Sequence, residues 1–139
     1  MTIRIRESER SDYGRVRDLL EQAGYLPHGF TEQRFGLMVE KCRGNNYVAD
    51  DNGKVVGTVF SMDNGAFLGY IGSLVVDNEY RRQGVGRELG RAVMKRFDEL
   101  KISRRFALIR KGNESSVNLL RSLDFEIRDS HYFADMVIE

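Results

Sequence analysis

An apolar strand, an arginine-rich loop with two glycines and an amphipathic helix follow one another between residues 67 and 100. Residues 67–76 are apolar almost throughout, which is typical of a strand that is covered on both faces of a sheet. The helix is expected to begin near Val85, and its apolar stripe consists of Leu89, Val93, Phe97 and Leu100. This succession predicts an α/β fold, in which the helix packs on the sheet that contains the strand.

The other elements are predicted from hydrophobic periodicity and from turn and capping residues. Residues 51–53, Asp-Asn-Gly, are a strong hairpin signal, and Ser11, Asp12 and Thr31 are residue types that cap helices. The expected helices follow Asp12, Thr31, Gly84 and Asn113, and the expected strands are 3–7, 46–50, 54–62, 67–76, a buried 104–110, 125–129 and 132–139. The order β-α-α-β-β-β-α-β-α-β-β shows no repeat or linker. We therefore expect one α/β domain over residues 1–139, with a single mixed sheet.

Charge and cysteine content argue against several classes of protein. The formal net charge is +1, but residues 81–96 hold six basic side chains and one acidic one, so this segment carries +5 and the rest of the chain −4. A local cationic patch on a nearly neutral chain favours a small anionic ligand over a nucleic acid. The single cysteine, Cys42, excludes an internal disulfide and argues against a structural metal site. No signal segment and no apolar run near the roughly 20 residues of a membrane span is evident, so we expect a cytoplasmic protein without membrane contact.

The loop at residues 81–87 has the features of an anion site. The first turn of a helix leaves up to four backbone N–H groups unpaired, and its dipole places about half a positive charge there. Gly84 and Gly86 lack Cβ atoms, so a bulky anion can approach the backbone. Arg81, Arg82 and Arg87 add full charges and forked donors, which suit phosphate oxygens. A diphosphate is the ligand that these features describe best.

Two common nucleotide-binding patterns are absent from this loop. The P-loop pattern with its Gly-Lys-Ser/Thr ending is missing, which disfavours nucleotide hydrolysis of that kind. The dinucleotide pattern of three glycines fails because its third position is Leu89, and no acidic residue follows where ribose recognition would need one. Coenzyme A remains, with its diphosphate and its long amide-bearing arm.

The chain resembles the GNAT superfamily of acyl-CoA-dependent N-acetyltransferases. The family motif is arginine or glutamine, two free positions, glycine, one free position and then glycine or alanine, and residues 81–86 match it. A second family motif is matched at Asn113, Ser116, Leu119 and Phe125. The predicted element order agrees with the family over essentially the whole chain. The resemblance implies transfer of an acetyl group from acetyl-CoA to a primary amine, by direct attack in a ternary complex.

The resemblance also implies roles for individual positions. The backbone of Leu74, Val75 and Val76 would pair with the pantetheine arm, as an added strand would. Amides of the loop would bind the diphosphate, and Asn113 and Ser116 would lie beside the arm and the phosphates. The implied cofactor-binding residues are Leu74, Val75, Val76, Arg81, Arg82, Gln83, Gly84, Val85, Gly86, Arg87, Asn113 and Ser116. Asn113 is also a natural helix cap, and the two roles are compatible.

The sequence departs from the family at the positions that usually transfer protons. Leu120 stands where many relatives have a tyrosine acid, and Gly72 and Ser73 stand where a glutamate or aspartate base is common. Asp124 replaces a usual glycine. Proximity of amine and thioester would still accelerate transfer, since general acid–base help contributes only about 10²–10⁴-fold. Tyr132 is the side-chain candidate for a replacement acid, and its alternative reading is a half-buried strand aromatic.

Three functional hypotheses stay open at this point. The first is the acetyltransferase, with a small-molecule amine or a protein or peptide amine as acceptor and with acetyl or a longer acyl group as donor. The second is a GNAT-like module that senses acyl-CoA without turnover. The third is an RNA-binding module, although residues 81–96 lack the interleaved aromatics that such modules use. A homodimer through the C-terminal strands is also possible.

Overall fold

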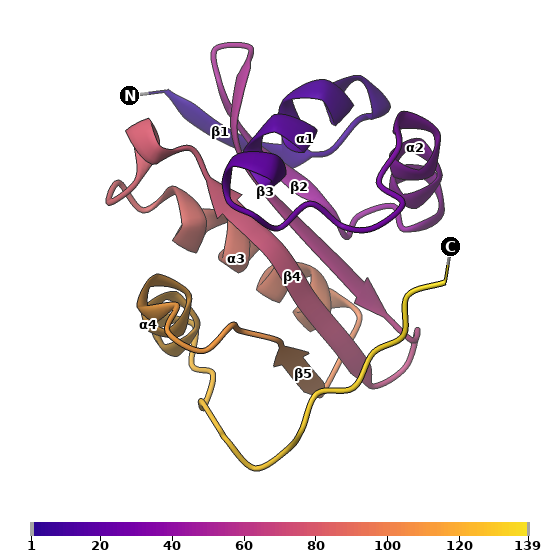
Figure 1. Cartoon of the computed structure of the whole chain (residues 1–139), viewed down its shortest axis with the longest axis vertical. Coiled ribbons are helices and arrows are strands. Elements are labelled where there is room, and N and C mark those ends of the chain that lie inside the picture. The colour runs from indigo at the N-terminus through magenta and orange to yellow at the C-terminus, as the bar shows by residue number, and fades with distance from the viewer. Residues whose placement is uncertain (1, 139) are drawn as a thin grey trace.

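The computed structural model describes residues 2–138, whose strands and helices form one sheet with helices on both faces (Figure 1). The strands are β1 Ile3–Glu7, β2 Tyr47–Asp51, β3 Lys54–Asp63, β4 Leu68–Val76 and β5 Arg104–Ala107. The helices are α1 Tyr13–Gln22, α2 Glu32–Lys41, α3 Val85–Glu99 and α4 Glu114–Ser122, with 3₁₀ helices η1 Arg10–Asp12 and η2 Asn78–Tyr80. Met1 and Glu139 lie outside the described residues. The predicted α/β fold is confirmed, and the predicted order holds from β1 to α4.

The strands lie in the sheet in chain order, β1-β2-β3-β4-β5. Neighbours from β1 to β4 are antiparallel, whereas β5 runs parallel to β4. The predicted hairpin joins β2 to β3, and Asn52 and Gly53 take positive φ values of 51° and 96°. Helix α3 makes the crossover that a parallel pair requires, and it thereby places its N-terminus at the end of β4.

Apolar side chains fill the space on both faces of the sheet. Helix α3 covers one face, and α1 and α2 cover the other (Figure 1). The core under α3 is Ala49, Val56, Val59, Ile71, Val85, Leu89, Val93, Phe97, Ile102 and Leu120. The core under α1 and α2 is Val16, Leu19, Leu20, Phe35, Val48, Val55 and Val75. The apolar stripe predicted for α3 therefore faces the sheet, and the single cysteine, Cys42, is half-buried.

Strand β5 is shorter and less buried than its sequence predicts. It spans Arg104–Ala107 in place of the expected 104–110, and none of its residues is buried. It pairs with β4 alone, so among residues 2–138 it forms the edge of the sheet. Phe106 is consequently 37% exposed. An apolar run alone did not distinguish this edge strand from a central one.

The two strands predicted at the C-terminus are not formed in the described residues. No helix or strand is assigned between Ser122 and residue 138, and the chain from Glu126 onward is exposed. In Figure 1 this segment runs past β5 and ends on the side of α2. Tyr132 is 103% exposed. Alternating apolar residues favour a strand only when a neighbouring strand supplies hydrogen bonds, and this segment pairs with none.

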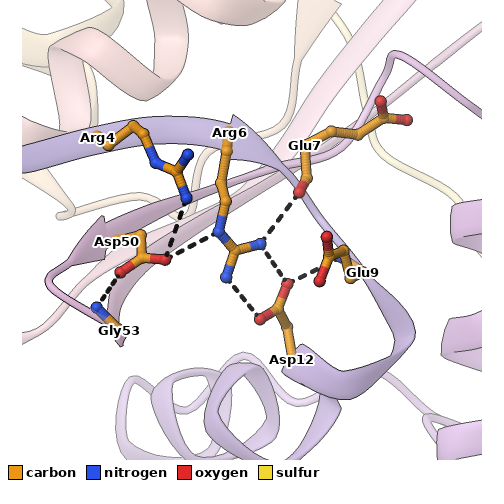
Figure 2. Close-up of polar contacts among 7 residues, drawn as sticks. All are labelled: Arg4, Arg6, Glu7, Glu9, Asp12, Asp50 and Gly53. Atoms are coloured by element: carbon orange, nitrogen blue, oxygen red, sulfur yellow. Dashed lines mark hydrogen bonds and ion pairs between the residues drawn. The ribbon is translucent and has the colours of Figure 1, made fainter.

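A charged network joins β1, β2 and the start of α1 (Figure 2). Arg6 donates to both carboxylate oxygens of Asp12 at 2.9 Å, and its Nε donates to Asp50 at 2.9 Å. Asp12 also accepts from the Glu9 amide at 2.8 Å, which fixes η1. The bond from Arg6, together with one from the Gly53 amide, holds the pKa of Asp50 below its ordinary value. Because these buried carboxylates have partners, the network has a structural role.

Candidate active site

Strand β4 changes its pairing half-way along, at a bulge. Between Gly72 and Val75, two residues of β4, Ser73 and Leu74, face a single residue of β3. Ser73 has φ 49°, in the left-handed region that residues other than glycine rarely adopt. Bulges bend a strand and redirect its main-chain groups, and they are enriched beside active sites.

The sheet opens on the other side of β4 just before this bulge. Strand β5 pairs only with Leu68–Ile71 of β4. Beyond Ile71, no strand among residues 2–138 pairs with this side of β4. The main-chain groups of residues 74–76 that point toward the gap are therefore available to an extended, amide-bearing molecule, which could bind as an added strand.

Helix α3 begins at the end of this open stretch without a side-chain cap. Its N-cap is Gly84, with φ 80°, and Arg82 has φ 63°. The first bond from an amide to the carbonyl four residues back is Glu88 N–H to Gly84 O, at 3.0 Å. The amides of residues 85–87 precede that bond and lack intrahelical acceptors. Left-handed residues next to a helix start direct several N–H groups to one side, which is the geometry of an anion-binding nest.

Basic side chains surround this helix start. Arg81, Arg82 and Arg87 are all exposed. Arg81 Nε donates to the Val76 carbonyl at 3.4 Å, which holds this guanidinium beside the end of β4. With the helix dipole they form a positive field around the free amides, as the sequence predicts. The arrangement suits a diphosphate that lies against the backbone.

The two glycines of α3 have different neighbours. A Cβ on Gly86 would stand 3.4 Å from Leu74, 3.5 Å from Val76 and 3.5 Å from Leu119, so side chains of β4 and α4 lie beside this glycine. A Cβ would fit there at ordinary contact distances. A Cβ on Gly90 would meet Leu123 at 2.5 Å, so that glycine allows the chain after α4 to pack on α3.

The start of α4 is tied to the loop after α1. Asn113 caps α4, because its Oδ1 accepts from the Ser116 amide at 3.1 Å. Its Nδ2 donates to the Tyr25 hydroxyl at 2.7 Å. Arg110 lies over the Tyr25 ring at 4.5 Å and donates to the Gly24 carbonyl at 3.1 Å. Two loops that are far apart in the sequence thus meet at the start of α4.

The turn between β4 and the arginine loop is anchored on both sides. Arg15 of α1 donates to Asp77 at 2.5 Å, and Asp77 accepts from the Glu79 amide at 2.9 Å. The Glu79 amide, followed by Arg15, lowers the pKa of Asp77. The Tyr80 hydroxyl donates to Asp51 at 2.5 Å, and this bond raises the pKa of Tyr80. The chain therefore enters the loop from a fixed position.

One hollow lies apart from these features, and a smaller one adjoins them. A cleft of about 460 Å³ lies between the end of β1 and α2, and none of the expected site residues lines it. A much smaller hollow adjoins Val75, Val76 and Arg81. Residues 2–138 contain no group of three or more histidine, cysteine or acidic side chains that could hold a metal ion. None of the helices described there combines the length and apolarity that crossing a membrane requires.

Sequence comparison decides the family. The sequence model of the acetyltransferase (GNAT) family matches residues 4–125. The chain belongs to this family. The predicted resemblance is thereby confirmed, as is the predicted class of enzyme, an acyltransferase.

Individual relatives agree with this placement. The N-alpha-acetyltransferase of Sulfurisphaera tokodaii is 27% identical over 146 residues, which cover 95% of this chain and 86% of that protein. The crystal structure of Ard1 from Thermoplasma volcanium has a TM-score of 0.79 at 21% identity, and the match covers 93% of this chain and 86% of that one. The structure of AAC(6')-Iy, in complex with the bisubstrate analog CoA-S-monomethyl-acetylneamine, has a TM-score of 0.77 at 17% identity and covers 98% of this chain and 100% of that one. The structural likenesses show that this GNAT member shares their fold.

The GNAT structure brings most of the predicted cofactor residues together. Leu74 and Val76 at the end of β4 lie beside Gly86, Arg81 bonds the Val76 carbonyl, and Leu119 of α4 also lies beside Gly86. Leu120 is 7% exposed and belongs to the core, as its apolar character indicates. Tyr132 lies on the exposed C-terminal segment and stays a prediction.

Sequence reasoning missed the residues that position this site. Arg15, Asp77 and Tyr80 are ordinary surface types whose partners lie far away in the chain, and no motif signals them. Tyr25 is likewise part of no motif, and its hydroxyl accepts from the Asn113 side chain that caps α4.

Proposed function

We propose that this GNAT acetyltransferase transfers an acetyl group from acetyl-CoA to a primary amine, by direct attack in a ternary complex. The diphosphate of coenzyme A would lie against the amides of residues 82–87, with Arg81, Arg82 and Arg87 around it. The pantetheine arm would pass Gly86 and pair with the backbone of residues 74–76. Asn113 and Ser116 would border the arm from the start of α4.

One observation carries this proposal: α3 has a glycine N-cap at the point where β4 has lost its neighbour. An uncapped helix start alone binds many anions, and a free strand side alone binds many peptides. Coenzyme A needs both, since it has a diphosphate at one end of an arm that carries two amides. Gly86 lies between the two features, beside Leu74 and Val76 of β4.

The reaction would be ordinary aminolysis of a thioester. The neutral amine nitrogen attacks the carbonyl carbon, the C–N bond forms, and the C–S bond breaks to release coenzyme A as a thiol. The proton lost from nitrogen balances the one gained by sulfur. Holding both reactants side by side supplies several kcal/mol, about 7–11 in the best intramolecular cases. The S. tokodaii relative is named an N-alpha-acetyltransferase, which supports the α-amine of a peptide N-terminus as the acceptor class to test first.

Two measurements test the proposal together. Calorimetry with coenzyme A measures binding, and release of free thiol from acetyl-CoA measures turnover with a panel of peptides that differ at their first residue and a panel of small amines. We expect binding and turnover with at least one amine. Tight binding with no turnover on any amine would favour the hypothesis of an acyl-CoA sensor over that of an enzyme. The buried Leu120, at the position of the usual acid, is the observation that supports the sensor hypothesis. Absence of coenzyme A binding would contradict both.

A further inference from the structure

Tyr70 of β4 places its ring along its own strand. Side chains alternate between the faces of a strand, and Gly69 lies against Phe97 of α3, so Tyr70 faces the side of α1 and α2. Its hydroxyl reaches forward over Gly72: a Cβ added to that glycine would lie 2.6 Å from the hydroxyl oxygen. Gly72 therefore makes room for the tyrosine. The hydroxyl lies immediately before the bulge at Ser73.

The surroundings of this hydroxyl suit a neutral phenol. Tyr70 pairs with Phe106 of β5, and their ring centroids are 5.2 Å apart. Tyr70 is half-buried. Burial raises the pKa of Tyr70 above its ordinary value, and no charge or hydrogen bond contributes to that shift. A phenol of this kind stays protonated and can donate its proton, whereas it is a poor base.

The hydroxyl lies where the reacting end of the cofactor would be. In the proposed function the diphosphate binds at the start of α3, and the arm runs back along residues 76 to 74 of β4. The thioester, at the far end of the arm, then comes next to Ser73 and Gly72. The gap between β4 and β5 begins at the same place, since β5 pairs with β4 only up to Ile71.

We propose that the Tyr70 hydroxyl is the proton donor to the departing sulfur of the thioester. This inference rests on the proposed function and assigns the role that the family's usual position, Leu120, cannot fill. As the C–S bond breaks, the proton of Tyr70 passes to sulfur and coenzyme A leaves as a thiol. The phenolate then takes up the proton that the acylated nitrogen loses, directly or through water. Tyr70 ends neutral, and the net reaction is that of an amine with an acyl thioester.

The first test is Tyr70→Phe, which keeps the ring against Phe106. We expect kcat to fall by about 100-fold or more, with the affinity for coenzyme A unchanged by calorimetry. Tyr47→Phe is the matched control, since Tyr47 is also a half-buried strand tyrosine but its hydroxyl bonds the Gly44 carbonyl away from the gap. Tyr132→Phe tests the other candidate acid. An unchanged kcat in Tyr70→Phe, with an active wild type, overturns the role of Tyr70 alone; an inactive wild type overturns the proposed function and this role with it.

A second test does not depend on removing the hydroxyl. A general acid must be protonated, so activity is lost as pH rises through its pKa. The ordinary tyrosine value is about 10 and burial raises it, so wild-type kcat should hold to about pH 10. A fluorinated tyrosine at position 70 is more acidic. In that variant kcat should begin to fall at a lower pH than in the wild type, with little change in kcat at neutral pH. If kcat of this variant depends on pH in the same way as that of the wild type, the assignment is overturned. The acidity of a purely structural tyrosine would not change the pH at which kcat falls.

Discussion

Helices α3 and α4 pack against each other, but their first turns are arranged in opposite ways. Asn113 caps α4, with its Oδ1 accepting from the Ser116 amide at 3.1 Å. Helix α3 starts at Gly84, which has no side chain to do this. The comparison shows that the protein itself caps one helix start, while the first amides of the other lack intramolecular acceptors.

Packing explains why α3 can begin without a cap. It has 15 residues, and the buried ones are Val85, Leu89, Gly90, Val93 and Phe97. Helix α4 has nine residues, of which only Leu120 is buried. A cap contributes about 1 kcal/mol, a small part of what the apolar face of α3 supplies but a substantial share for α4. The long helix can therefore leave its first amides free without unfolding.

The largest expected effect comes from closing the start of α3 with a charge. Gly86→Asp should weaken coenzyme A binding by about 100-fold or more, equivalent to about 2.7 kcal/mol, because a carboxylate in the first turn of α3 would repel the proposed diphosphate. The fold should persist, since the new Cβ meets Leu74, Val76 and Leu119 only at ordinary contact distances. An acidic residue in the first turn even stabilises a helix. Calorimetry and urea unfolding measure the two effects separately.

The matched control introduces the same charge at another helix start. Gln33 lies exposed in the first turn of α2, which Thr31 already caps. Gln33→Asp should leave coenzyme A affinity unchanged. If Gly86→Asp folds and still binds coenzyme A with wild-type affinity, the diphosphate is not at the start of α3.

A smaller effect is expected from opening the start of α4. Asn113→Ala removes the cap and the bond to the Tyr25 hydroxyl, so the free energy of unfolding should fall by about 1–2 kcal/mol. Thr31→Ala removes the equivalent cap of α2 and should cost about 1 kcal/mol. Denaturant unfolding compares the two variants. Only the Asn113 variant should also weaken coenzyme A binding, because in the proposed function α4 borders the pantetheine arm and α2 does not.

Tyr25→Phe separates the two roles of Asn113, since it removes the link between the loops and keeps the cap. We expect a stability close to wild type and a modest loss of coenzyme A affinity. Equal losses of affinity in the Thr31 and Asn113 variants would show instead that general destabilisation, and not the arrangement beside β4, weakens binding.

The sequence predicts a cofactor site at the start of α3 because the signals for it are local. Gly84, Gly86 and the arginines adjoin one another between a strand and a helix, so the composition of a single loop is enough to predict an anion site. The caps Thr31 and Asn113 were visible for the same reason: a side-chain oxygen and the amide that it accepts from lie within one turn. The hairpin at residues 51–53 also depends only on its own turn residues.

The features that sequence reasoning missed depend on contacts between distant residues. Arg15 and Asp77 are 62 positions apart, and Asn113 and Tyr25 are 88 apart. Tyr70 gave no signal because its placement depends on the pairing of β4 with β5 and on the bulge that follows. The strands predicted after Phe125 failed for a related reason: their alternation is visible in the sequence, but whether a neighbouring strand is available is not.

The smallest expected effect concerns the turn before the arginine loop, where Asp77 caps η2 and also forms an ion pair with Arg15. The pKa of Asp77 is lowered in the fold, so its charged form contributes stability above the ordinary aspartate value and loses it as pH falls through the folded pKa. We expect Asp77→Asn to be less stable than wild type at pH 6, by less than about 1 kcal/mol because the pair is partly exposed. The difference should shrink as pH drops below about 4, and Arg15→Gln should follow the same course. Urea unfolding at a series of pH values measures this, and a difference that stays constant down to pH 3 would show that charge at Asp77 does not hold the turn.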